Sequence, residues 1–554
     1  MMAGMSTEVQ VKRLHHVLLW PLRLMPTDGS PAAPRRPWEL LAGSPWQEVV
    51  DEYTGDASCF HERHYQEFVT FLPYVQRVLY GEGRSGRQAN TSSEDTFGGS
   101  GIKVFRRHDI RALRAQLRPG EAPLRLDVIH VDLNFFVDVD VVLLNVELSA
   151  EDLPLTQVQE LLYRLGRAYP AGWDAQGLPL HCLANAEFLG EGDAVLARSD
   201  AMDRERFLAH VQAHRAPRIA AHWAFLLRPL LSEQADEAGR LRYRQIDNYR
   251  MPVMAYLALD DPGRLGRADF IRLGLVAGAG DNSEDRSGLP YSEQHLHDFE
   301  QRYCYDRFWA TGGTAPQTRY LCSGQAMVVL GRADAEFYAC RDRGVLAQFR
   351  HQHALIFMLA HFQKAALLMF SDRLVEALRR LDVQDADSVR RFKRAIRSCF
   401  EGFLRFTHRY WFHEVAEQAQ ARALFSLCSK HLETDALFTE VKTRISDMNS
   451  YLETDSLRRQ ANTVVRLTVV TILGMVGTIT TGFLGMNLLA EADAPLLNRI
   501  VWFSVTMVIT IGMTVYTMAK SKRLSDFLDA LSDERLSARQ KLMAFGAVWR
   551  KPSQ

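Results

Sequence analysis

The sequence predicts an N-terminal α/β domain, then a long helical stalk, and finally two transmembrane helices at the C-terminus. Three observations support this prediction. Residues 125–148 alternate apolar and polar side chains in the manner of β-strands, and a helical pattern follows them. After about Arg341 the strand patterns stop, and helical sequence with few prolines or glycines continues. Two later stretches, 467–490 and 500–519, contain no charged residue.

The composition excludes some classes of protein. The chain has 554 residues, which is more than one ordinary domain needs, and its formal net charge is zero. No basic surplus points to a nucleic-acid partner. The seven cysteines contain no C-x-x-C pair, so neither a disulfide framework nor a zinc knuckle is indicated. The N-terminus lacks the pattern of a signal peptide, and we expect the bulk of the chain to lie in the cytosol.

These patterns predict six segments along the chain. They are a cytosolic α/β/α domain (1–380) with flexible loops near 81–101 and 278–288, a helical stalk (381–466), a first transmembrane helix (467–487), an extracellular loop (488–499), a second transmembrane helix (500–519), and a cytosolic tail that is basic and amphipathic (520–554).

The predicted stalk carries an apolar seam at heptad-like spacing, formed by Val441, Ile445, Met448 and Leu452. Such a seam is typical of a helix that packs against copies of itself or against neighbouring helices. Further along, the same positions are polar: Asp455, Arg459 and Asn462. A seam that turns polar just before a membrane favours a water-filled vestibule.

Each charge-free stretch is long enough to cross a bilayer, which takes about 20 residues. One such stretch could be a buried core helix, but two in tandem favour a membrane. Basic residues flank the pair on its outer ends (Arg466, Lys520, Lys522 and Arg523), while the connecting loop contains Glu491 and Asp493. The positive-inside rule then predicts a multi-pass membrane protein with both termini and this basic ring in the cytosol.

The first predicted span has one small or polar face and one bulky face. At about 100° per residue, the first face holds Leu467, Thr471, Gly474, Met475, Thr478, Gly482 and Gly485. The other holds Val469, Ile472, Leu473, Val476 and Phe483. Small residues serve close packing of membrane helices and would equally serve the lining of a pore. The stripe therefore leaves both interpretations open.

The first span ends in TTGFLGMNLL, and its Gly485, Met486 and Asn487 resemble the Gly-Met-Asn motif of the CorA family of magnesium and related divalent-cation channels. The resemblance implies a CorA-like homopentameric funnel in a bacterial-type inner (plasma) membrane, in which the first span lines the pore. It places side-chain oxygens of Asn487 at the outer mouth. It also matches Thr478 to a polar pore threonine, and Met475 and Leu467 to the apolar constriction.

The function implied is passive, voltage-driven flux of a divalent cation and no enzymatic reaction. Mg²⁺ keeps its waters, so neutral amide oxygens can select the hydrated ion without trapping it. No P-loop motif is present. A divalent ion gains about 4.6 kcal/mol in crossing about 100 mV, so no ATP or other cofactor is needed. The family implies that the ion is also a regulator. The alternative is a non-conducting membrane-anchored signalling or scaffold protein with the same architecture.

The loop after the motif departs from the family. Magnesium-transporting members carry a Met-Pro-Glu-Leu-like segment there, whereas this chain retains only Pro495 and Leu496. Co²⁺, Ni²⁺ or Zn²⁺ are therefore alternative substrates, and a ZntB-like or divergent branch is an alternative assignment. Glu491 and Asp493 could concentrate cations by their field, or could be ordinary solvated loop residues.

Other polar groups invite functional interpretations. His295, His297, Asp298 and Glu300 could form a cytosolic metal sensor, but ligands two apart diverge on a helix, which favours a polar helix start. Four histidines are interpreted as helix-surface or core residues (His351, His353, His408 and His413). Four strand carboxylates are interpreted as solvent-facing (Asp127, Asp132, Asp138 and Asp140).

Overall fold

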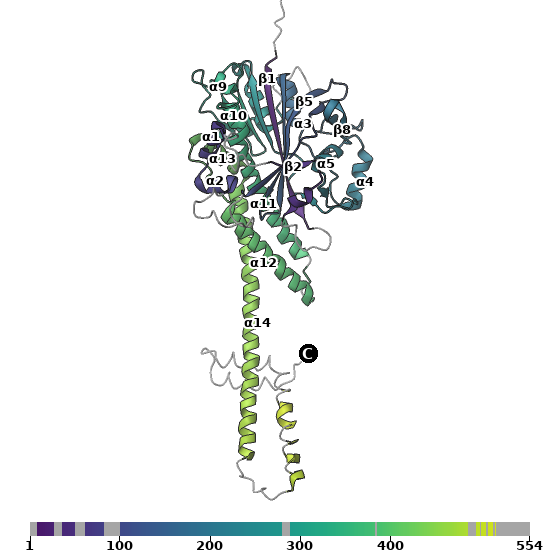
Figure 1. The fold of residues 1–554 in the computed structure, drawn as a ribbon, viewed down its shortest axis with the longest axis vertical. Coiled ribbons are helices and arrows are strands. Elements are labelled where there is room, and N and C mark those ends of the chain that lie inside the picture. The colour runs from purple at the N-terminus through teal and green to yellow at the C-terminus, as the bar shows by residue number, and fades with distance from the viewer. Residues whose placement is uncertain are drawn as a thin grey trace, which may run out of the picture. The chain divides into compact units, whose positions relative to one another are not determined.

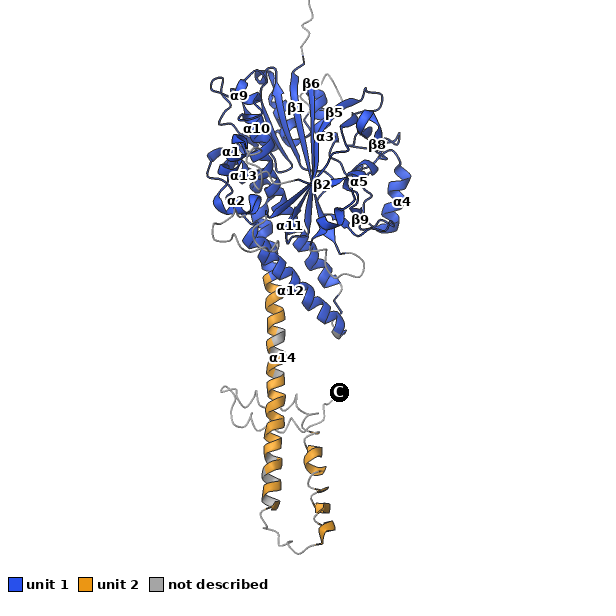
Figure 2. Ribbon diagram, in the orientation of Figure 1, with its two compact units in different colours: residues 1–445 blue, residues 446–554 orange. Residues whose placement is uncertain are grey.

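The computed structural model describes residues 8–26, 36–49, 61–81, 100–279, 289–379, 381–382, 385–485, 495–498, 500–502, 504–505, 508–513 and 516. The chain forms two compact units, Met1–Ile445 and Ser446–Gln554 (Figure 2). Most of the two predicted loops near 81–101 and 278–288 lies outside the described residues.

The larger unit is built on a 14-stranded mixed sheet, which confirms the predicted α/β class (Figure 1). Its main path runs β12-β13-β14-β11-β1-β6-β5-β4-β7-β8. The strands are β1 (Gln10–Met25), β2 (Trp46–Glu48), β3 (Ile102–Arg107), β4 (Ala112–Gln116), β5 (Leu124–Phe136), β6 (Val141–Pro154), β7 (Asn185–Leu189), β8 (Val195–Arg198), β9 (Leu231–Ser232), β10 (Arg242–Gln245), β11 (Val253–Leu259), β12 (Cys304–Tyr305), β13 (Arg319–Cys322) and β14 (Ala326–Arg332).

The helices of the chain follow between and after these strands. They are α1 (Glu62–Thr70), α2 (Pro73–Tyr80), α3 (Leu155–Arg164), α4 (Arg204–His214), α5 (Ala221–Leu227), α6 (Arg267–Leu275), α7 (Glu293–Leu296), α8 (Phe299–Tyr303), α9 (Glu336–Ala339), α10 (Val345–Gln348), α11 (Ala354–Arg379), α12 (Ala386–Arg409), α13 (Ala419–Leu432) and α14 (Thr434–Gly485), with short turns η1 (Pro37–Leu41), η2 (Glu191–Asp193), η3 (Pro262–Arg264) and the π-helical η4 (Phe349–His353).

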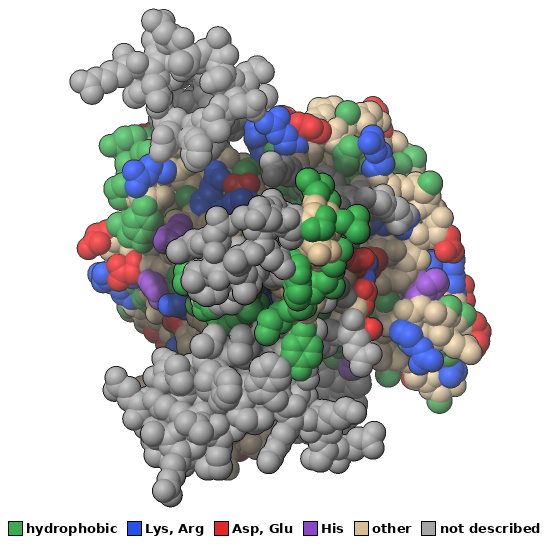
Figure 3. All heavy atoms as spheres, turned by 90° about the horizontal axis from the view of Figure 1, so that it is seen from below, with side chains coloured by type: hydrophobic (Ala, Val, Ile, Leu, Met, Phe, Trp, Pro, Cys, Tyr) green, Lys and Arg blue, Asp and Glu red, His purple; other side chains and the backbone are tan. Residues whose placement is uncertain are grey.

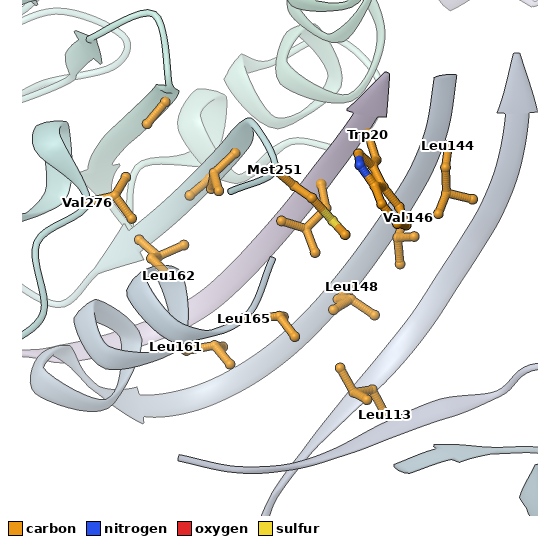
Figure 4. Packing of buried hydrophobic residues seen from close by; sticks show 14 of the residues in the cluster. Trp20, Leu113, Leu144, Val146, Leu148, Leu161, Leu162, Leu165, Met251 and Val276 are labelled. Carbon is orange, nitrogen blue, oxygen red and sulfur yellow. The ribbon is translucent and has the colours of Figure 1, made fainter. Parts of the chain in front are cut away.

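The two faces of the central strands have different chemistry, because side chains alternate along a strand. On β6, the buried side chains of Leu144, Val146 and Leu148 join the main hydrophobic core with Trp20 and helix α3 (Figure 4). The residues between them, including Glu147, point to the other face, where η4 and α11 lie against β1 and β6. The sheet is therefore covered on both faces.

Helix α11 is apolar on most of its circumference and is largely buried in the larger unit. Ion pairs fix the position of its C-terminal end. Glu376 accepts hydrogen bonds from Arg23 Nη2 at 2.8 Å and from Arg244 Nη1 at 2.7 Å, and Asp372 pairs with the same two arginines. The Arg23 guanidinium, from β1, is only 4% exposed. These ion pairs tie the helix to strands β1 and β10.

Among the described residues, one helical stretch is long and apolar enough to cross a membrane: Val345–Arg379, which contains α10, η4 and α11. In its most apolar window 72% of the residues are buried in the fold, as expected of a core helix. The described part of the first predicted span contributes a shorter apolar helical stretch, Thr463–Met475. The two predicted membrane spans remain predictions.

Helix α14 has 52 residues and contains the predicted stalk seam. Val441 and Ile445 are 0% and 1% exposed within the larger unit of this single chain. Near them Phe438 stacks on Trp411, with ring centroids 4.2 Å apart. The first two seam residues therefore pack within the chain itself. Met448 and Leu452 are partly exposed, and the side chains of Asp455, Arg459 and Asn462 lie outside the described residues.

Candidate functional site

The C-terminal half of α14 brings the predicted pore-lining stripe together on one side of a continuous helix. Leu467, Thr471, Met475, Thr478 and Gly482 follow one another at steps of four, four, three and four residues, as one helical face requires. Leu467 is 66% exposed and Met475 is 61% exposed. The other three residues are exposed as well. In the part of the chain that the structure describes, this stripe is an exposed surface.

The glycines of this helix fall into two groups. A Cβ atom added at Gly474, Gly482 or Gly485, all on the stripe, would meet nothing within 4 Å. A Cβ added at Gly477 would lie 3.0 Å from Cγ2 of Thr510, which belongs to the second helical segment of the same unit. Small-residue packing therefore occurs at Gly477 in the single chain, and the stripe glycines take no part in it.

Val469 marks the side of the helix opposite the stripe. It projects about 200° from Leu467, at about 100° per residue, and is only 3% exposed. Ile472, which was predicted on the same bulky face, is 50% exposed. Burial within the single chain therefore does not separate the two predicted faces, and the two-faced helix stays a prediction.

The stripe threonines donate their hydroxyl protons along the helix. Thr471 Oγ1 donates to the carbonyl of Leu467 and Thr478 Oγ1 to the carbonyl of Gly474, both at 2.9 Å. With its proton used, each hydroxyl oxygen still has a lone pair available as an acceptor. Acceptors are what the outward-facing hydrogens of a hydrated cation require.

The second helical segment of the smaller unit, described at 496–498, 500–502, 504–505, 508–513 and 516, has an apolar surface. Leu496 and Leu497 are 74% exposed, Trp502 is 60% exposed and Val508 is 68% exposed. Apolar side chains form the green surface near the middle of Figure 3. Exposure of this many large apolar residues is typical of a surface that meets a membrane or another protein.

Several predicted site residues fall outside the described residues. They are Met486 and Asn487 of the motif, Glu491 and Asp493 of the predicted loop, and Lys520, Lys522 and Arg523 of the predicted basic ring. Gly485 and Arg466 are described, and both are exposed.

The His295–Glu300 segment forms two short helices in the larger unit. Ser292 caps α7 by accepting a hydrogen bond from the backbone N–H of His295, and Glu300 pairs with Arg267 at 2.7 Å. In the described part of the chain no group of three or more histidine, cysteine, aspartate or glutamate side chains is placed to hold a metal ion. The segment is the polar helix start that the spacing favoured.

Glu147 is the centre of a buried polar layer that sequence reasoning missed. This carboxylate is 3% exposed and contacts His15 Nδ1 at 3.1 Å, His130 Nε2 at 3.0 Å and Arg350 Nε at 2.6 Å. Burial alone would raise the pKa of Glu147. The hydrogen bond from His15 and the charge of Arg350 outweigh burial and lower this pKa to about 2.

The prediction that the strand carboxylates face solvent was wrong for Asp132. Asp132 is 4% exposed and accepts hydrogen bonds from Arg106 Nε at 2.7 Å and Nη2 at 2.9 Å. Asp140 pairs with Arg373 of α11 and is only partly exposed. Asp127, with a side chain 71% exposed, does face solvent. The arginine partners come from the adjacent strand β3 for Asp132 and from helix α11 for Asp140, which the alternation along one strand could not reveal.

Two of the four histidines lie in opposite environments. His353 is 3% exposed, and burial lowers its pKa to about 4, as for a core histidine. His413 has a side chain that is 74% exposed, as for a surface histidine. The described cysteines are all free, although the Cys322 and Cys428 sulfurs lie 3.2 Å apart in the core.

Comparison of this chain with known protein families, with curated proteins and with solved structures gave no match.

Proposed function

We propose that this chain is a CorA-type divalent-cation channel, with Mg²⁺ as the preferred substrate. Copies of the chain, five by analogy with the CorA family, would surround a central path in an inner membrane, with both termini in the cytosol. The ion is moved by the membrane potential, and the protein carries out no enzymatic reaction.

One observation carries the proposal. In the helix that leads to the Gly-Met-Asn motif, the stripe from Leu467 to Gly485 is exposed in the described part of its unit, while Gly477 provides the close contact with the second segment. A stripe of threonines, glycines and two apolar side chains is available to face copies of itself. A purely structural small-residue face would instead be expected at the contact within the chain.

The chemistry of the stripe suits a hydrated divalent ion. Thr471 and Thr478 retain acceptor lone pairs, and the glycines leave room beside them. Leu467 and Met475 would form the apolar constrictions that gate such a path by dewetting. In the sequence, Asn487 adds neutral amide oxygens at the outer end, suited to an ion that dehydrates reluctantly.

The experiment is flux into proteoliposomes that contain a fluorescent Mg²⁺ indicator, with an imposed potential negative inside. We expect influx that Asn487→Ala strongly reduces. The matched control is Asn498→Ala, because this exposed asparagine belongs to the same predicted external side but not to the motif. Equal flux in the two variants would remove Asn487 from the mechanism.

The same assay separates the channel from a scaffold. If the wild-type protein conducts none of Mg²⁺, Co²⁺, Ni²⁺ and Zn²⁺, the channel proposal fails and the non-conducting membrane scaffold replaces it. The order of the four fluxes identifies the preferred metal.

A further inference from the structure

A small cavity in the larger unit lies beside the polar layer around Glu147. Its volume is about 100 Å³, and its polar lining comes from β1, β6 and the segment around η4: Arg13 and His15, Ser149 and Glu151, and Arg341 and Arg350. In the sheet Arg13 lies opposite Glu151 and His15 lies opposite Ser149, so these four side chains share one face.

Three departures from regular secondary structure meet around this cavity. The β1–β11 register shifts between Val11 and Arg13, and the β5–β6 register shifts between Val128 and His130, next to the lining residue Ile129. Arg350 itself lies in the π-helical turn η4. β-Bulges and π-helical turns re-aim side chains and are frequent at functional sites. Here the two register shifts and the π-helical turn lie next to the polar side chains that line the cavity.

The charges of the lining favour an anion. The lining contains three guanidinium groups and one carboxylate, that of Glu151. A second carboxylate, Glu147, forms an ion pair with Arg350. Arg13 Nε is 3.5 Å from Glu151, and it is a buried donor without a hydrogen-bond acceptor among the described residues. Arg341 is exposed, and no ion pair to another described residue is found for it. A buried donor without an acceptor is costly unless a ligand or water supplies one.

We propose that this cavity binds the oxygens of a phosphate group through Arg13, Arg341 and Arg350. Arginine suits this task because its planar fork of N–H groups matches phosphate oxygens, and the Ser149 hydroxyl adds a further donor. A cavity of about 100 Å³ is well below the 300 Å³ or more of a typical cofactor pocket. The group bound inside is therefore inorganic phosphate or the terminal phosphate of a larger molecule whose remainder stays outside.

The test is calorimetric titration of the purified full-length protein in detergent with inorganic phosphate and, separately, with ATP without divalent metal, at constant ionic strength. We expect saturable binding of at least one of them. Binding of inorganic phosphate identifies the free ion as the source, and binding of ATP alone identifies a phosphate on a larger molecule. No heat from either ligand would overturn the proposal.

The variant Arg341→Gln tests whether binding occurs at this cavity, because this exposed residue can be changed without disturbing the core. We expect at least tenfold weaker binding. Arg343→Gln is the matched control: Arg343 is two residues away and pairs with Glu62. Equal weakening in both variants would overturn the site. Because the readout is binding to the larger unit, its failure is independent of any result on ion flux.

Discussion

Glu147 on strand β6 accepts hydrogen bonds from both Nε and Nη2 of Arg350, at 2.6 and 3.3 Å, and so joins the centre of the sheet to the turn that begins the core helix α11. The two residues are 203 positions apart in the chain. The same carboxylate also contacts His15 and His130 from the two neighbouring strands. One buried side chain thus connects β1, β5, β6 and the helical layer.

Replacing Glu147 by Gln should destabilise the larger unit strongly. The substitution leaves the Arg350 charge without its buried counterion, and breaking a buried pair costs about 3–5 kcal/mol. We expect a clear drop in the midpoint of thermal unfolding of the full-length protein. Glu151→Gln is the control: its partner is Arg13 but its side chain is 66% exposed, so the cost should stay below about 1 kcal/mol. Similar midpoints for the two variants would contradict the role given to Glu147.

His16 provides a pH-dependent test of the sheet. It is fully buried, neither ring nitrogen has a hydrogen-bond partner among the described residues, and burial lowers its pKa from 6.5 to about 3. Between these values the unfolded chain binds a proton that the folded chain does not. Folding stability therefore falls as the pH drops below 6.5, by about 1.4 kcal/mol per pH unit for this group.

The variant His16→Leu removes both this proton linkage and an unsatisfied polar group. We expect a higher unfolding midpoint at pH 7 and a smaller decrease of that midpoint between pH 7 and pH 5. A slope in His16→Leu as steep as in the wild type would show that His16 does not carry the linkage.

The α/β class and the long helix that carries the stripe were predictable because each rests on local periodicity. Alternation identified the strand region of 125–148, and steps of three and four identified the stripe from Leu467 to Gly485. Neither depends on which distant segment packs alongside. These features could therefore be predicted from single stretches of sequence.

The polar layer could not be predicted in this way. Glu147 stands between Val146 and Leu148, which fits either a solvent-facing or a helix-covered position. What decides between them is Arg350, far along the chain, in a turn whose π-helical form has no simple sequence signal. The wrong assignment of Asp132 has the same origin, because its arginine partner comes from the adjacent strand β3. The available sequence signal for a buried ion pair was a carboxylate placed between large apolar residues on a strand.

Two glycines of α14 should respond differently to the same change. Gly477→Val places a side chain against Thr510, and overpacking of this kind costs about 1–3 kcal/mol. Gly482→Val has open space in its own chain. We expect Gly477→Val to lower the yield of correctly assembled protein in gel filtration and Gly482→Val to assemble normally but conduct less. The opposite pattern would mean that the helix uses its other face for packing within the chain.

Cysteine reactivity offers a test of the larger unit that is independent of flux. Hydrogen bonds from the backbone N–H groups of Arg343 and Asp342 lower the pKa of Cys340, which is partly exposed. Burial raises the pKa of Cys182 to about 12 and that of Cys399 to about 11. Since the thiolate is the reactive form, maleimide at neutral pH should modify Cys340 first among these three. Peptide mapping by mass spectrometry checks the order, and Cys340→Ser should remove the fast phase. Earlier labelling of Cys182 would contradict the described packing.

Thr478→Val tests whether the stripe contributes acceptor oxygens to the ion path. Valine keeps the branched shape but removes the hydroxyl, whose oxygen retains a lone pair after its donation to the carbonyl of Gly474. If each lost acceptor costs the passing hydrated ion about 1 kcal/mol, flux should fall roughly fivefold, and more if several copies line the path.

Thr510→Val is the matched control. It makes the same chemical change on the second helical segment, beside Gly477 and away from the stripe, and should leave flux within about twofold of the wild type. The measurement is initial Mg²⁺ influx in proteoliposomes with equal amounts of assembled protein. A larger loss in Thr510→Val than in Thr478→Val would mean that ions do not pass along the exposed stripe.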